Sequence, residues 1–238
     1  MASPKDIRRA IKRDVRAATR AARKPGPAQP LSRERIVATA LAIVDRDGLP
    51  ALSMRRLGAE LGADPMAVYH YVPNKGALLD AIVEAVMSEI DLGIDDPAQP
   101  AEERIMCAAR AYRDTMLAHV NALPIVLSRG PATPAAMRPV ELLIGILRDA
   151  GLSPSQAMAG MNALAATVRG TVAMVADSGA EPPSIDELHA MAEIFPPDQF
   201  PYLREAAMCA PDYLEADFDF GVRALARGLL ASAPDARA

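Results

Sequence analysis

The first third of the chain carries apolar residues at helical spacing, bounded by residues that start or stop helices. Ser32 precedes one such run and Gly48 follows it. The apolar residues that share one face of this run are Ile36, Ala40, Ile43 and Val44. The pattern predicts an amphipathic helix that begins after Ser32 and ends before Gly48.

Capping residues divide the next part of the chain into three shorter predicted helices. The first lies between the cap Ser53 and the stop Gly62, and the second begins after the cap Asp64 with Pro65 in its first turn. Asn74 caps the third. Because two short helices joined by a Gly-containing turn follow a longer helix, the pattern predicts a helix-turn-helix.

The remainder of the chain also reads as helices. Helical runs are predicted over residues 102–120, 135–150, from Ser153 onward, 185–195 and 212–233, and the stretch "LPIVLSRGPATP" is expected to break the pattern. The apolar stripe of the long helix after Ser153 comprises Met161, Leu164, Val168, Val172 and Val175, and we expect it to be core. The fold class predicted from these runs is all-α.

Composition agrees with a helical protein. The 238 residues are 51% hydrophobic and include no Trp, which fits a core of Ala, Leu, Val and Met in one or two domains. Cys107 and Cys209 lie far apart without a metal-binding motif, so we expect two reduced buried thiols, with no metal and no cofactor. No charge-free apolar run is long enough to span a membrane.

Charge is distributed unevenly along the chain. The net charge of −4 combines +7 over residues 1–30, +1 over residues 31–75 and −12 over residues 76–238. A polyanion is therefore attracted to the N-terminal third and repelled by the rest, although a basic arm can also be merely solvated. The arm resembles an organelle transit peptide in being basic and helix-prone, but Asp6 and Asp14 favour a cytoplasmic protein.

The second helix of the predicted helix-turn-helix has an unusual outward face. Val68 and Val72 share one side and are expected to point into the core, which turns Pro65, Met66, Tyr69 and His70 outward. Apolar, phenol and imidazole groups fit the base edges, thymine methyls and phosphates of a major groove. Lys75, at a helix start with free N–H groups, fits a phosphate. The alternative is that these side chains are ordinary half-exposed groups.

Residues 31–79 resemble the DNA-binding domain of the tetracycline-repressor (TetR) family through "RERIVATALAIVDRDGLPALSMRRLGAELGADPMAVYHYVPNKGALL". The resemblance implies a helix-turn-helix domain over residues 31–92, after a basic arm and Pro-rich linker over residues 1–30. Tyr71 stands where many members have His. The resemblance implies DNA contacts at Ser53, Pro65, Met66, Ala67, Tyr69, His70 and Lys75. We add Tyr71 to this set of predicted DNA-contacting residues.

Residues 101–238 are similar to the C-terminal domain of the TetR subclass closest to the tetracycline repressor, on the stretches "HVNALPIVLSRG", "RDAGLSP" and "FDFGVRALARGLL". The resemblance implies a ligand-binding domain and a two-fold four-helix dimer interface. On the last helix, small residues permit close helix approach, which alone would also fit internal packing. The predicted interface comprises Phe218, Gly221, Ala224, Leu225 and Gly228.

The ligand pocket is predicted from polar residues on mostly apolar helices. Asn162 and Arg169 share a face of the long helix, and Tyr112 and His119 lie on the first helix of the second domain. A few polar groups in an apolar cavity are typical of a small-molecule site, and Arg169 favours an anionic or carbonyl-bearing ligand. The alternative is a solvated face for the long helix. For His119 near Asp114, a satisfied core or pocket histidine is favoured over acid–base chemistry.

Function follows from these features and from what is missing. The sequence contains no GxSxG, no phosphate-cradling Gly-rich loop and no HExxH, so we expect no enzyme. We expect a homodimeric transcriptional regulator, most simply a repressor, that binds double-stranded DNA at a palindromic operator and is released by a small-molecule effector. The alternative is a ligand-independent architectural or constitutive DNA-binding protein.

Overall fold

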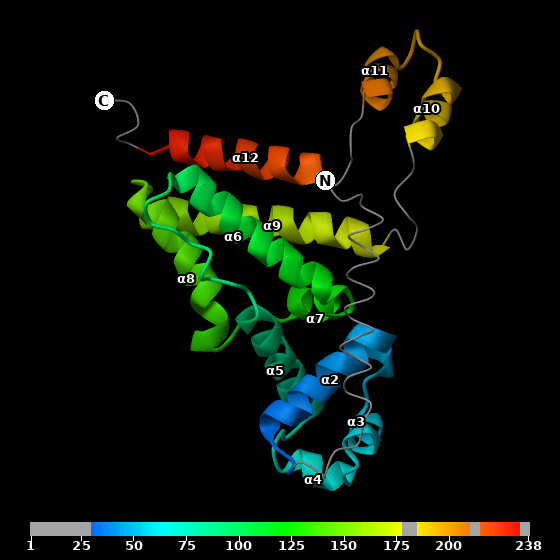
Figure 1. The fold of residues 1–238 in the computed structure, drawn as a ribbon, viewed down its shortest axis with the longest axis vertical. Helices are drawn as coiled ribbons and strands as arrows, with labels where there is room; N and C mark the ends of the chain where they lie inside the picture. Colours follow the sequence, from blue (N-terminus) through cyan, green and yellow to red (C-terminus); the bar gives the residue numbers. More distant parts are fainter. Residues whose placement is uncertain (1–29, 178–184, 210–214, 234–238) are drawn as a thin grey trace. The chain divides into compact units, whose positions relative to one another are not determined.

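The computed structural model describes residues 30–177, 185–209 and 215–233, and in these ranges the regular structure is helical (Figure 1). The all-α prediction is therefore confirmed. The predicted basic arm and nearly all of the Pro-rich linker lie outside the described residues. The chain forms two compact units, one of residues 1–91 and 114–139, the other of residues 92–113 and 140–238.

The first unit contains the four helices that the N-terminal pattern predicts. They are α2 (Arg33–Asp47), α3 (Met54–Leu61), α4 (Pro65–Tyr69) and α5 (Lys75–Ser88), with a short 3-10 turn η1 (Leu49–Ala51) between α2 and α3. α2 packs against α3 and α5, and α3 packs against α4 (Figure 1). The fully buried side chains at the centre of this unit include Ile36, Ile43, Leu57, Val68, Leu78 and Ile82.

The predicted caps are present at each helix of this unit. The side-chain oxygens of Ser32, Ser53, Asp64 and Asn74 each accept a hydrogen bond from a backbone N–H in the first turn of the helix that follows. Gly62 ends α3 in the left-handed conformation at φ 66°, where a side chain would be strained. Local sequence therefore determines where each of these helices begins, and at α3 also where it ends.

A segment from the middle of the chain belongs to the same unit. It holds the end of α6 (Ala101–Ala118), the 3-10 turn η2 (Val120–Ala122) and the helix α7 (Leu123–Ser128). η2 packs against α2 and α7 packs against α5. The expectation that "LPIVLSRGPATP" breaks the helical pattern was wrong for its first half, because Pro124 fits the first turn of α7 and Leu123, Ile125 and Val126 are buried.

The second unit is built from the start of α6 and from later helices. These are most of α8 (Pro134–Asp149), α9 (Pro154–Asp177), α10 (Ile185–Ile194), α11 (Pro201–Cys209) and α12 (Glu215–Ala231). α9 lies beside α12, and α10 packs against α11 (Figure 1). On the predicted stripe of α9, Leu164, Val168 and Val172 are buried, which confirms its central part as core. The domain limits at residues 92 and 101 stay a prediction.

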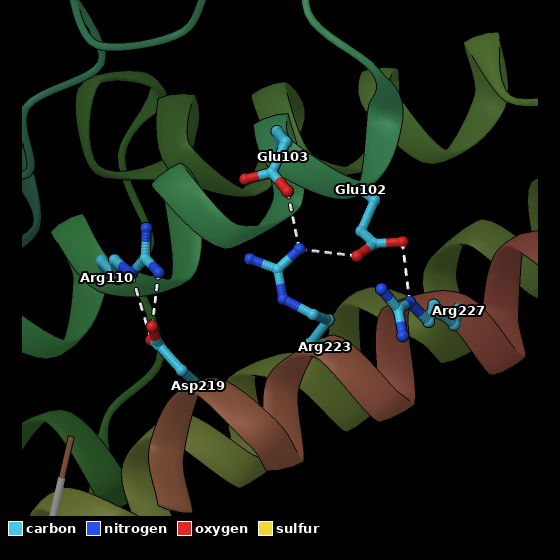
Figure 2. A network of polar contacts seen from close by, with 6 residues as sticks. All are labelled: Glu102, Glu103, Arg110, Asp219, Arg223 and Arg227. Carbon is cyan, nitrogen blue, oxygen red and sulfur yellow. Dashed lines mark hydrogen bonds and ion pairs between the residues drawn. The ribbon is translucent and has the colours of Figure 1, made fainter. Parts of the chain in front are cut away.

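Ion pairs fix α12 alongside α6 within the second unit (Figure 2). The Arg223 guanidinium lies 2.6 Å from carboxylate oxygens of both Glu102 and Glu103, and Arg227 lies 3.0 Å from Glu102. Arg110 on α6 makes a two-point contact with Asp219 on α12. Hydrogen bonds to the arginines hold the pKa of Glu102 and of Asp219 below their usual values. A network of this kind sets the register of two helices better than a single exposed pair does.

The turn between α3 and α4 depends on a close backbone approach at Gly58. A Cβ on Gly58 would lie 2.8 Å from the Ala63 carbonyl oxygen and 3.2 Å from the Pro65 ring, so the backbone would have to shift. We predict that Gly58→Ala destabilises the protein by about 1–3 kcal/mol. Gly145→Ala is the matched control, because its Cβ would meet open space, and it should be neutral or slightly stabilising. Denaturant unfolding that gives equal stability for both variants would show that α3 and α4 do not approach closely.

Candidate nucleic-acid interface

The surface that the sequence predicts to contact DNA is the outward face of α4. This helix has only five residues, and it is held by Val68, which is fully buried, and by Val72 just after it, which is 2% exposed. Burial of these two side chains turns Met66, Tyr69 and Tyr71 outward, with exposed fractions of 68%, 40% and 44%. His70 is also exposed, whereas Pro65 and Ala67 are half-buried at the edge of the surface.

Lys75 lies at the first position of α5 and has a structural contact of its own. Its Nζ donates a hydrogen bond to the Leu52 carbonyl oxygen at 2.9 Å, which ties the start of α5 to the residue that precedes the Ser53 cap. An ammonium has three N–H donors, so this contact leaves donors for a second partner. Lys75 is exposed as a residue, and a phosphate contact stays a prediction.

Arg55 is an exposed cation on α3, the helix that packs against α4, and sequence reasoning missed it. It is exposed in the first turn of α3, and within the described ranges no hydrogen bond or ion pair engages its guanidinium. Its neighbour Arg56, in contrast, pairs with Asp47 and Glu60. The two arginines are equivalent in the sequence, so only their pairing in the fold distinguishes the one that is available to a partner.

The residues predicted for the dimer interface do not all share one surface. Gly221 and Gly228 have open space beside them, and Ala224 is exposed between them. Phe218 is instead 3% exposed within the chain, and the Arg113 guanidinium carbon lies 4.5 Å from the centre of its ring. Leu225 is half-buried. The small residues therefore form the exposed strip, and Phe218 belongs to the core beneath it.

The neighbouring helix α9 carries a comparable strip. Asn162 and Ala166 are exposed, and a Cβ added to Gly170 would meet nothing within 4 Å. Met158 and Met174 are exposed on the same helix. α9 and α12 pack against each other, and each carries small exposed residues beside which another helix could approach closely.

Two of the predicted pocket residues are half-buried in the second unit. Burial raises the pKa of the Tyr112 phenol, and the positive charge of Arg169 opposes that rise, so these two groups interact. Arg169 uses its Nε to donate to the Ala165 carbonyl oxygen at 3.1 Å. Its two terminal nitrogens have no bond to a described residue, which leaves a half-buried guanidinium with free donors. Asn162 is exposed.

His119, the fourth predicted pocket residue, has other partners in the first unit. Its Nδ1 lies 2.9 Å from Asp45 Oδ2 and its Nε2 lies 2.8 Å from Glu89 Oε2, with 12% of the side chain exposed. Burial alone would lower the pKa of His119, but hydrogen bonds to both carboxylates outweigh burial and raise the pKa to about 9. Both ring nitrogens are therefore occupied, and no group of three side chains suited to a metal ion occurs in the described part of the chain.

Helix-turn-helix geometry with an exposed second helix is typical of DNA-binding proteins, and comparison with known proteins specifies the family. Residues 36–82 match the model of the bacterial regulatory proteins of the tetR family, and residues 96–233 match that of the tetracyclin repressor-like C-terminal domain. The chain belongs to the TetR family, as the sequence resemblance predicts.

Individual relatives are consistent with this assignment. The transcriptional repressor DrrR1 of Streptomyces coeruleorubidus is 36% identical over 132 residues, which cover 54% of this chain and 47% of DrrR1. The class C tetracycline repressor protein of Escherichia coli is 30% identical over 170 residues, covering 70% of this chain and 77% of that repressor. The chain thus spans about half the length of the first of these relatives.

Solved structures extend the comparison to the fold. The TetR family protein ActR of Streptomyces coelicolor, in complex with actinorhodin, has a TM-score of 0.75 and 31% identity, covering 87% of this chain and all of ActR. ActR in complex with (S)-DNPA has a TM-score of 0.72 and 32% identity, covering 86% of this chain and all of ActR. No helix among the described residues has the length and apolar character needed to cross a membrane.

Proposed function

We propose that this protein is a DNA-binding transcriptional repressor that acts as a homodimer on a palindromic operator and dissociates when a small molecule binds its second unit. The observation that carries the proposal is the outward face of α4, where Met66 and Tyr69 are exposed, with exposed Tyr71 just after the helix, while two buried valines hold the helix in place. A helix presented in this way fits a major groove.

Cations near α4 support DNA as the partner. Arg55 and Lys75 are exposed at the starts of α3 and α5, where helix N-termini also favour anions such as phosphate. The basic arm, with its charge of +7 over residues 1–30, adds a non-specific attraction to DNA. Residues 76–238, with −12, are repelled by it, so only the N-terminal third would approach the duplex.

A homodimer would place two recognition helices on successive half-sites. Half-sites of a palindrome are about 34–36 Å apart, or a multiple of that distance, and a two-fold dimer matches this symmetry. The strips of α9 and α12, which include Gly170, Gly221 and Gly228, are the surface that we propose for such a dimer, since glycines there would let a partner helix approach closely.

An effector site in the second unit is proposed around Tyr112 and Arg169. A half-buried guanidinium with free donors is costly to leave unpaired, so an anionic or carbonyl-bearing ligand would satisfy it. The relatives support a small-molecule effector, because ActR is known in complex with actinorhodin and with (S)-DNPA. A constitutive DNA-binding protein is the alternative, and it would have no ligand that lowers its affinity for DNA.

The DNA contacts can be separated by their salt dependence. Lys75→Ala should weaken binding to all duplexes and reduce the salt dependence of the affinity by about one unit of slope, because one phosphate contact is lost. Arg55→Ala should have the same effect, because we propose that Arg55 also contacts a phosphate. Tyr69→Ala should weaken binding by about 1–3 kcal/mol with the slope nearly intact. Arg46→Ala is the control, since Arg46 is already paired with Asp47 and Glu60. Titrations with a duplex selected from a random pool measure these effects, and wild-type affinity for Tyr69→Ala and Lys75→Ala would contradict the assignment.

The dimer can be tested by enlarging one small residue. Gly228→Leu should give monomers, because a two-fold contact meets the added side chain twice, and the monomers should bind the selected duplex weakly. Gly145→Leu on α8 is the matched control, since Gly145 also has open space beside it but lies outside the two strips. Sedimentation that finds an intact dimer for Gly228→Leu would move the interface to another surface.

The effector site can be tested by ligand stabilisation. In a thermal-shift screen of small aromatic carboxylic acids, at least one compound should raise the unfolding temperature and release the protein from DNA. Arg169→Ala should abolish that shift, whereas Asn162→Ala should retain it because Asn162 is exposed. A compound that releases DNA and stabilises Arg169→Ala as strongly as the natural chain would place the pocket elsewhere.

A further inference from the structure

His119 joins the ends of two helices in the first unit. Asp45 lies in the last turn of α2, and Glu89 is the residue that ends α5. The imidazole bridges them through opposite nitrogens at 2.9 Å and 2.8 Å. We name these three residues the His119 cluster.

The cluster compensates an unfavourable charge arrangement. The C-terminal end of a helix carries partial negative charge, so an acidic side chain there is destabilising unless a cation is close. Asp45 and Glu89 both occupy such positions, and one oxygen of Asp45 is buried without a hydrogen bond to any described residue. An imidazolium between them therefore offsets two carboxylates and two helix ends at once.

Nearby charges do not replace this cation. Arg46, next to Asp45 on α2, is paired with Asp47 and Glu60. Asp114 on α6 and Asp91 after α5 are the next ionisable residues on the segments that carry His119 and Glu89, and both are acidic. Loss of the His119 proton would therefore leave the carboxylates of Asp45 and Glu89 beside a neutral imidazole.

The segment that carries His119 also contacts α2 and the opposite end of α5. Asn121 donates from Nδ2 to the carbonyl oxygen of Asp45 on α2 at 2.8 Å. Arg129, at the end of α7, donates to the Gly76 carbonyl oxygen at 3.1 Å and pairs with Asp80. α5 is thus held at both ends by one segment, and its first residue is Lys75, the proposed phosphate contact.

We propose that the His119 cluster is a proton-dependent lock that holds α5 against α2, and that release of the His119 proton lowers the affinity of the protein for DNA. The proposal rests on the DNA-binding function proposed above. His119 would act as a positioning residue, since it lies at the end of α5 opposite Lys75 and would itself make no contact with DNA. It would bring the N-terminus of α5 into the position in which phosphate binding is strongest.

The pH range follows from the two pKa values of His119. The pKa is about 6.5 in the unfolded chain and about 9 in the fold. The stabilising contribution of the cluster is therefore complete below pH 6.5 and is lost as pH rises through 9. At pH 9.5 about three quarters of the chains would have lost the proton, so affinity for DNA should fall about fourfold relative to pH 7 if only the protonated form binds.

The experiment compares the natural chain with three variants between pH 6.5 and 9.5, using a duplex selected from a random pool at fixed salt. His119→Gln removes the charge, and Glu89→Gln removes one carboxylate on the exposed side of the cluster, which should move the loss of affinity to lower pH. His189→Gln, on α10 of the second unit, is the matched histidine control. The titration of the His119 ring protons by NMR and the unfolding temperature are followed in parallel.

The expected result is a loss of affinity in the natural chain and in His189→Gln that follows the His119 titration near pH 9, and a weaker affinity in His119→Gln that shows no such loss between pH 8 and pH 9.5. An affinity of the natural chain that does not change with pH, or a His119 titration near pH 6.5, would overturn the proposal. If His119→Gln fails to fold, an unchanged pH profile in Glu89→Gln overturns it instead. Absence of DNA binding at every pH would overturn the proposed function, and the coupling to DNA with it.

Discussion

The surface that we propose for DNA recognition depends on the burial of two valines that hold a helix too short to be stable alone. A single turn of five residues lacks the hydrogen bonds to overcome the cost of helix nucleation, so α4 persists only because Val68 and Val72 are buried against the core of the first unit. The close approach at Gly58 then brings α3 against α4. With one side of α4 fully committed to packing, the other side is free to present Met66 and Tyr69 in a fixed orientation, which is what groove recognition requires.

Local features of the first unit were predictable from the sequence, and its long-range packing was not. The caps at Ser32, Ser53, Asp64 and Asn74 depend only on residues within one turn, so they can be recognised from the sequence. The partners of His119 lie 74 and 30 residues away in the sequence, at helix ends that the pattern gives no reason to bring together. Sequence reasoning therefore placed His119 with the pocket residues, whereas in the fold it is the centre of an ion-pair cluster. α7 was missed because its apolar residues are too few to show a period.

The exposed strips of the second unit show why helical spacing alone misplaces single residues. Phe218 lies seven residues before Leu225, so a repeat of seven assigns them one face together with the glycines. In α12 Phe218 is buried with Val222 and Ala226, while Gly221 and Gly228 lie on the open side. Size does not separate these two sides, because Ala226 is buried and Phe220 is 78% exposed. The helical phase does, since Phe218, Val222 and Ala226 follow one another at intervals of four residues on the buried side, and the small residues on the open side leave room for a further helix.

The surface that we propose to face DNA is distinguished by whether its arginines form ion pairs with carboxylates, more than by how many charges it has. The second unit contains many arginines, but Arg110 and Arg223 are matched with carboxylates across α6 and α12 and so add little attraction for a polyanion. Arg55 is a single residue, yet its guanidinium has no partner in the described structure, and it lies at the positive end of α3, the helix that packs against the proposed recognition helix α4. The field that orients the protein on DNA would therefore come from a few unmatched cations near α4 and from the basic arm, while the acidic remainder of the chain keeps other surfaces away from the duplex.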